Sequence, residues 1–177
     1  MNAKQYLVLL ALVLSMTGCD QQQPYQSRLQ EIFPPVPIQH AALNRINHLP
    51  VTPAYFRDRW TWVLFGPPDC PRHCRTRLQL ANRQQSAQAL FVVEGLANHD
   101  QLNQLSADFP AVAIGMATTA ASSDNFNRQF ALESGYENDK SSYFYLINPQ
   151  GELAYVVTSS GLRAADLELE IKLLEGS

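Results

Sequence analysis

The sequence lacks several features that would mark particular classes of protein. Basic residues are not in excess, because 13 Lys and Arg stand against 16 Asp and Glu and the net charge is -3, so we expect no nucleic acid partner. No internal repeat, glycine-rich phosphate loop, nucleophile elbow or H-E-x-x-H motif occurs. Cysteine is scarce, with 3 in 177 residues, while 46% of the residues are hydrophobic. This composition fits one globular domain plus a small additional segment.

The N-terminal apolar stretch is too short to span a bilayer. Residues 6–14 (YLVLLALVL) follow Lys4 and suit the hydrophobic region of a secretory signal. The segment continues to S-M-T-G-C, which ends at Cys19 and resembles a bacterial lipoprotein signal. In such signals the cysteine is lipidated and becomes the first residue of the mature chain. An ordinary cleaved signal and a short membrane anchor are the alternatives.

These features predict the organisation and location of the chain. We expect residues 1–18 to be a lipoprotein-type signal peptide, residues 19–44 the lipidated N-terminus with a tether rich in Gln and Pro, and residues 45–177 the folded domain. Asp20 resembles the residue that keeps enterobacterial lipoproteins in the inner membrane. The expected location is therefore the bacterial cell envelope, with the lipid in the inner membrane and the domain facing the periplasm.

Strand and helix patterns alternate along the domain. Short β-rich or buried runs predict strands, and segments of helix formers with apolar residues on one side predict helices. The two runs on either side of N-P-Q-G predict a β-hairpin. The expected elements are strand 60–65, helix 76–87, strand 89–93, helix 99–108, strand 111–116, helix 124–133, strands 143–148 and 153–158, and helix 162–175. This order predicts an α/β fold of the thioredoxin-like type, with a mixed central sheet flanked by helices.

Two cysteines in residues 65–78 (FGPPDCPRHCRTRL) are the best candidates for chemistry. Cys70 follows the first strand of the domain, at the carboxyl edge where α/β sheets bind their ligands. Pro71 suits the first turn of a helix, and the positive end of that helix favours thiolate over thiol. Three nearby arginines add positive charge: Arg72, Arg75 and Arg77. If Cys19 carries lipid, Cys70 and Cys74 are the remaining thiols, in an oxidising compartment where they can pair. We therefore expect them to be reactive.

The C-x3-C spacing leaves several interpretations open. On a helix, residues four apart hold their Cβ atoms about 5–6 Å apart, whereas a disulfide needs about 3.8 Å, so a disulfide requires Cys70 to lie in the loop. Two thiolates at this spacing can instead converge on Cu(I), which is a soft ion. A structural zinc site is disfavoured because it needs four protein ligands. A purely structural disulfide would close a very small loop and stabilise the fold little.

The histidines offer few additional ligands. His73 lies between the cysteines and could reach a metal only through an irregular turn, so an exposed loop histidine is the simpler interpretation. His99 follows the second strand at the same sheet edge, but it lies next to Asn98, a natural helix cap. His40 and His48 lie in or near the tether and are weaker candidates.

Two segments, 56–78 and 143–151, resemble the Sco/SenC family of copper-handling proteins. The family motif F-G-x-x-x-C-P-x-x-C, which follows the first core strand, is matched by Phe65, Gly66, Cys70, Pro71 and Cys74. The resemblance covers most of the domain. It implies a thioredoxin-like fold, Cu(I) held by Cys70 and Cys74, and a role in assembling the copper centre of cytochrome c oxidase.

One feature of the family is replaced in this sequence. In the family, a histidine a few residues before a Y-L-I-D-P-like strand completes a Cys-Cys-His copper site, and Lys140 stands at that position when residues 145–149 (YLINP) are aligned. A protonated lysine cannot ligate a metal, but a lysine beside the pair would stabilise a thiolate. The chain is therefore interpreted as a divergent family member that acts by thiol–disulfide chemistry of Cys70 and Cys74, as a thiol–disulfide oxidoreductase.

Two other functions stay open at this point. Cys70 and Cys74 could hold Cu(I) in a metallochaperone with a substituted or missing third ligand, or they could form a structural disulfide in a non-catalytic binding module. Cu(I) is the one metal that the resemblance implies. The expected partners are the membrane, reached through the lipid on Cys19, and either a copper-site subunit of a respiratory oxidase or another thiol protein.

Overall fold

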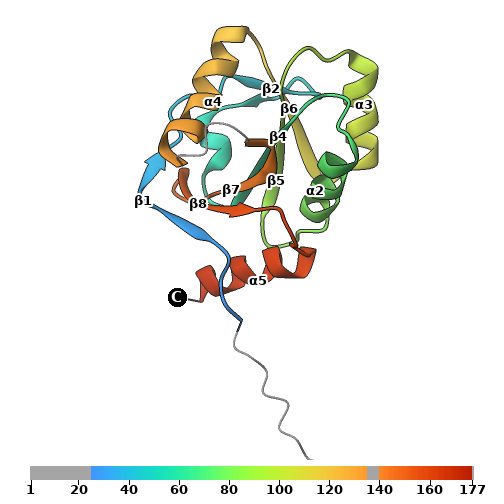
Figure 1. The fold of residues 1–177 in the computed structure, drawn as a ribbon. Helices are drawn as coiled ribbons and strands as arrows, with labels where there is room; N and C mark the ends of the chain where they lie inside the picture. The colour runs from blue at the N-terminus through green and yellow to red at the C-terminus, as the bar shows by residue number, and fades with distance from the viewer. Residues whose placement is uncertain (1–24, 135–139, 177) are drawn as a thin grey trace, which may run out of the picture.

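The structure, a computed structural model, describes residues 25–134 and 140–176. They form an eight-stranded sheet with helices on both faces (Figure 1), in the strand order β1-β8-β7-β4-β5-β6-β2-β3. The strands are β1 (Gln30–Pro37), β2 (Leu43–Arg45), β3 (Pro50–Val51), β4 (Thr61–Gly66), β5 (Gln88–Val93), β6 (Val112–Ala117), β7 (Tyr143–Ile147) and β8 (Glu152–Thr158). The helices are α2 (Arg72–Asn82), α3 (His99–Asp108), α4 (Ala120–Ser134) and α5 (Ala164–Glu175), with 3-10 turns η1 (Pro53–Phe56) and η2 (Lys140–Ser142).

Three parallel strands form the centre of the sheet. β4 pairs with β5 and β5 with β6, and the connections run through α2 and α3. The carboxyl ends of β4, β5 and β6 therefore lie at one edge, which is where α/β sheets place their ligands. β7 and β8 pair antiparallel and extend the sheet beyond β4, so the predicted hairpin and the predicted mixed sheet are confirmed.

Successive strand residues point to two hydrophobic cores, one on each face of the sheet. Trp62 and Leu64 of β4 pack with α2, α3 and α5, whereas Val63 and Phe65 pack with α4. All six residues of β4 are buried, as expected for a strand covered on both faces. Figure 1 shows α4 on one side of the sheet and α2 and α3 on the other.

The chain upstream of residue 45 belongs to the folded unit. β1 pairs antiparallel with β8, and β2 pairs antiparallel with β6. The sequence predicts a tether through residue 44, and the difference has a physical reason. Pro34 and Pro35 interrupt the alternation of apolar and polar residues, and prolines are tolerated in a strand that lies at a sheet edge. The β1–β8 ladder accordingly shifts its register between Glu31 and Val36.

The segment before β1 is attached to α5 by a buried carboxylate. Glu170, which is 2% exposed, accepts hydrogen bonds from Tyr25 Oη at 2.8 Å, Ser27 Oγ at 2.7 Å and the Arg28 backbone N at 2.6 Å. Burial, followed by the hydrogen bond to Glu170, raises the pKa of Tyr25 to about 12. Arg28 also donates to the carbonyls of Ser160 and Gly161, at 2.7 and 3.0 Å. These contacts hold the start of the described chain on the domain.

The residues at the start of two helices determine where these helices begin. α2 begins at Arg72, beside the cysteines as Pro71 indicates and ahead of the helix formers of residues 76–87, because Pro71 occupies the N-cap and its fixed φ suits the start of a helix. α4 begins at Ala120 rather than at residue 124. There, Ser122 N donates to Thr119 Oγ1 at 3.1 Å and Thr119 N donates to Ser122 Oγ at 2.9 Å, so the two side chains cap the first turn.

Candidate functional site

Cys70 and Cys74 form a disulfide just beyond the carboxyl end of β4. Cys70 lies in the loop between β4 and α2 with φ of +37°, in the left-handed region, and Cys74 lies in the first turn of α2. Their Cα atoms are 5.2 Å apart, within the range of disulfides. A disulfide at the C-x3-C spacing requires Cys70 to lie in the loop, and the structure places it there.

The disulfide is buried. Each cysteine is 1% exposed and belongs to the core on the α2 face of the sheet. Gly66 makes room for the pair, since a Cβ at this position would lie 3.1 Å from the Phe91 ring and 3.3 Å from Cys74 Sγ. The pair is therefore less accessible than its sequence environment indicates. Exchange with another thiol requires the structure around the pair to open locally.

Arg77, one helical turn after Cys74, is a buried clamp. It is 4% exposed. Its guanidinium donates hydrogen bonds to the carbonyl of Phe65 at 3.3 Å, to that of Tyr143 at 2.9 Å and to that of Ser141. It also lies over the Phe144 ring, with Cζ 5.6 Å from the ring centroid. Arg77 thus ties the cysteine helix to the end of β4 and to the η2–β7 segment.

Lys140, the residue aligned with the family histidine, contacts Glu94 and Phe65. Its Nζ lies 3.4 Å from Glu94 Oε1 and 5.4 Å from the centre of the Phe65 ring, and its side chain is 17% exposed. Asn127 of α4 donates to the same Glu94 oxygen at 3.4 Å. Phe65 belongs to the core on the α4 face, whereas the cysteines belong to the core on the α2 face. The ammonium is therefore held by a carboxylate on the α4 side of the sheet edge.

Most of the other candidate residues are exposed, and they lie on different elements. His73 and Arg72 are exposed on the first turn of α2, and Arg75 forms an ion pair with Asp108 of α3. His40 and His48 are exposed in the turns that flank β2, and His99 is exposed as the first residue of α3. Of the three arginines that the sequence analysis places near the pair, Arg77 alone is buried.

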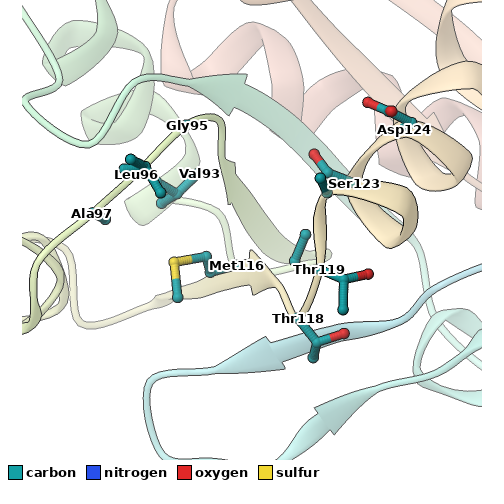
Figure 2. Close-up of a pocket in the computed structure, with 11 residues that line it drawn as sticks. Val93, Gly95, Leu96, Ala97, Met116, Thr118, Thr119, Ser123 and Asp124 are labelled. Carbon is teal, nitrogen blue, oxygen red and sulfur yellow. The ribbon is translucent and has the colours of Figure 1, made fainter.

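A hollow opens at the carboxyl ends of β5 and β6, beside the strand that leads to the disulfide (Figure 2). It has a volume of about 410 Å³. Val93, Leu96 and Met116 line it on one side, and Thr118, Thr119 and Ser123 line it near the start of α4. Leu96 is fully exposed. This hollow could not be predicted from the sequence, because it forms where two loops meet and neither loop carries a motif.

The residues of the pair fit a metal only partly. Oxidised cysteines offer no thiolate, so the disulfide form cannot bind Cu(I), whereas the reduced pair would supply two soft donors. Lys140 cannot be the third ligand while it is protonated and paired with Glu94. Within residues 25–134 and 140–176, no group of three or more His, Cys, Asp or Glu side chains is arranged to hold a metal ion.

Cys19, the expected lipidation site, lies outside the described residues. Among the helices that the structure does describe, none is both long enough and apolar enough to cross a membrane.

Solved structures resemble this fold although no sequence match is found. Neither a protein-family model nor a curated protein matches the sequence. Yeast Sco1 with copper bound has a TM-score of 0.64 at 17% identity, over 86% of this chain and 95% of that one. BsSco, a Sco family cytochrome c oxidase assembly protein with a disulfide switch, has a TM-score of 0.58 at 14% identity, over 81% and 96%. A SCO1/SenC family lipoprotein from Bacillus anthracis has a TM-score of 0.57 at 10% identity, over 85% and 95%.

These similarities concern the arrangement of the backbone. This chain covers 95–96% of the length of these three structures. MTB DsbF, solved in mixed oxidised and reduced forms, is similar as well. The predicted α/β fold of the thioredoxin-like type is therefore confirmed. The resemblance to the Sco/SenC family, first drawn from the F-G-x-x-x-C-P-x-x-C motif, is confirmed at the level of the fold.

Proposed function

We propose that the chain is a divergent Sco/SenC-like protein that acts in copper-centre assembly, for cytochrome c oxidase, through thiol–disulfide exchange by Cys70 and Cys74. The observation that carries this proposal is the disulfide itself, which joins the end of β4 to the first turn of α2. A helix N-terminus stabilises a thiolate released there. The fold shared with Sco structures supports the process.

The exchange begins with the pair in its reduced form. A thiolate of the pair attacks one sulfur of a disulfide in a partner protein, the partner's S–S bond breaks, and one partner cysteine leaves as a thiolate. The second cysteine of the pair then attacks the mixed disulfide, which releases the other partner thiolate. Two electrons pass to the partner, and the Cys70–Cys74 disulfide is the product. A thiol reductant of the cell envelope returns the pair to the dithiol.

Lys140 favours exchange over a copper site of the family type. Its ammonium occupies the position aligned with the third copper ligand and is held there by Glu94 at 3.4 Å. The pair alone would bind Cu(I) through two thiolates, which is the metallochaperone alternative. Copper in that case is cargo that passes to a copper-site subunit of a respiratory oxidase.

We further infer that the protein is a lipoprotein of the bacterial cell envelope, attached through Cys19 to the inner membrane and facing the periplasm. The signal-like residues before Cys19 and the similarity to a SCO1/SenC family lipoprotein support this placement. An oxidising compartment is where a disulfide such as Cys70–Cys74 can persist.

The reduction potential of the pair tests the proposal. Full-length protein is equilibrated with glutathione buffers, free thiols are alkylated, and the fraction of disulfide is read by mass. A redox role predicts a potential in the oxidoreductase range, roughly -120 to -270 mV. A value below about -300 mV would mark a structural disulfide and would contradict the proposal. The Cys70→Ser variant is the control, since it cannot form the bond.

The reduced protein is tested in parallel with a disulfide-bonded peptide and with Cu(I). We expect one peptide disulfide to be reduced for each Cys70–Cys74 disulfide formed. Cu(I) is then titrated against a competing chelator. Tight binding that disappears in Cys70→Ser would support the metallochaperone instead of the redox role. If Lys140→His created such binding, the alignment of Lys140 with the family ligand would be supported.

A further inference from the structure

We propose a site for Cu(I) that is formed by the side chains of His48, His99 and Met116. It does not involve Cys70 or Cys74 and does not rest on the function proposed above. In the sequence, His48 is a weak candidate because it lies near the tether, and His99 because it lies next to a helix cap. The fold brings both to one pocket with a methionine.

The pocket lies between the β2–β3 hairpin, the first turn of α3 and the end of β6. It has a volume of about 160 Å³, which is room for an ion and a few waters, since one water occupies about 30 Å³ of liquid. Asn44, Arg45, Ile46 and His48 line it from the hairpin, His99 and Leu102 from α3, and Ile114 and Met116 from β6. Each donor thus comes from a different element.

Hydrogen bonds fix the backbone that carries each donor. The antiparallel register places Asn44 opposite Met116, so the hairpin lies directly beside β6. His48 is held in the turn by its N–H, which donates to the Arg45 carbonyl at 2.8 Å, and it adopts φ of +59°. His99 follows Asn98, whose side chain and the Gln101 side chain form a reciprocal capping box. A ligand would therefore find these backbone positions already formed.

Met116 is partly buried and lines both this pocket and the larger hollow of Figure 2. Figure 2 shows its side chain extending from β6 toward the segment that carries Leu96 and Ala97, which leads into α3. A methionine buried only for packing would be enclosed by the core. This thioether lies at the boundary between the core and open space, where a soft ion can reach it.

The donor set selects the metal. Thioether and imidazole together suit Cu(I), whereas Ca²⁺ and Mg²⁺ require oxygen ligands. The lining contains no carboxylate. The charges facing the pocket are the positive end of α3 and Arg45, whose guanidinium lies 5.4 Å from the centre of the Tyr55 ring. Such surroundings penalise a divalent ion more than a monovalent one.

The site is separate from the cysteine pair but lies at the same edge of the sheet. The cysteines follow β4, and Met116 is on β6, two strands away. With neighbouring strands about 4.8 Å apart, β4 and β6 are about 10 Å apart, and the two sites share no residue. Binding at one can therefore be measured while the other is chemically blocked.

The test uses the full-length protein with the Cys70–Cys74 disulfide intact and any free thiol blocked with iodoacetamide. Cu(I) is titrated anaerobically against a competing chelator, and Zn²⁺ is titrated separately. The variants His48→Ala, His99→Ala and Met116→Leu remove one donor each, and Met116→Leu keeps the volume of the side chain. His40→Ala and His73→Ala are matched controls, because both histidines are exposed outside the pocket. Thermal unfolding verifies that each variant is folded.

We expect one Cu(I) per chain, an affinity reduced about tenfold or more in each of the three donor variants, and no change in the two controls. X-ray absorption should show a sulfur neighbour that is lost in Met116→Leu. The proposal is overturned if the oxidised protein binds no Cu(I), or if binding is unchanged in the three variants. Zn²⁺ binding as tight as Cu(I) binding and indifferent to Met116→Leu would overturn it as well.

Discussion

Replacing Arg77 by methionine tests whether the guanidinium holds the site together. The substitution keeps a long apolar stem over Phe144 but removes the donors to the carbonyls of Phe65, Ser141 and Tyr143. A buried acceptor that loses its partner costs about 1–3 kcal/mol. Partial relaxation of the η2–β7 segment makes the total for the three carbonyls smaller than three times this cost. We therefore expect Arg77→Met to lower the free energy of unfolding by about 3–5 kcal/mol, as for other broken buried charge networks.

The assay is urea unfolding of the oxidised protein, followed by the fluorescence of the buried Trp62. Arg75→Met is the matched control, because Arg75 lies on the same helix with its side chain 41% exposed and pairs at the surface with Asp108. Surface pairs contribute about 0–1 kcal/mol, so the control should lose less than that. If Arg77→Met also lost less than about 1 kcal/mol, the clamp would not be holding these elements together.

Three other predictions concern Gly66 and the carboxylates of α5. Gly66→Ala should lower the free energy of unfolding by about 1–3 kcal/mol, measured by thermal unfolding, because its Cβ would lie 3.1 Å from Phe91 and 3.3 Å from Cys74 Sγ; unchanged stability would contradict the close approach. The hydrogen bond from Arg163 holds the pKa of Asp166 below its usual 3.8. The contribution of this carboxylate to stability is therefore complete above pH 3.8 and is lost as the pH falls through the pKa of Asp166 in the folded protein. In thermal unfolding, Asp166→Asn should be less stable than the parent at pH 7, by about 1 kcal/mol as for a lost cap, and as stable as the parent in strong acid. Glu170→Gln should bring the pKa of Tyr25 down from about 12 toward 10, as read by NMR titration of the ring. A raised pKa stabilises the fold below pH 10, and this contribution is lost as the pH rises through 12, so the variant should lose less stability between pH 10 and pH 12 than the parent does. An unmoved Tyr25 pKa would show that Glu170 does not hold it.

Hydrophobic patterns predict the order of elements well, because the central strands are buried on both faces. The runs WTWVLF and ALFVV predict strands, and they form most of β4 and β5. β1 has no such pattern: its prolines break the alternation, and its place in the sheet depends on β8, which lies more than a hundred residues later. A partner so distant in the sequence leaves no local signal.

The position of Cys70 and Cys74 just beyond the first core strand could be predicted from the sequence, whereas their surroundings could not. The sequence gives no sign that Arg77 is buried, because its hydrogen-bond acceptors are backbone carbonyls, which every residue has. The sequence predicts Lys140 beside the sulfurs, but its ammonium pairs with Glu94, a residue that belongs to no motif. The pocket lined by His48 and His99 depends on the β2–β6 pairing.

The burial of the disulfide makes its reduction a gated reaction. A small thiol reaches Cys70 and Cys74, each 1% exposed, only during the intervals in which the structure around them opens. As the concentration of such a thiol rises, the rate of reduction should level off at the rate of opening. A protein that binds this edge and favours the open state would exceed that plateau. Gating of this kind would leave the pair unreactive toward the bulk thiols of its compartment and responsive to the one partner that opens it.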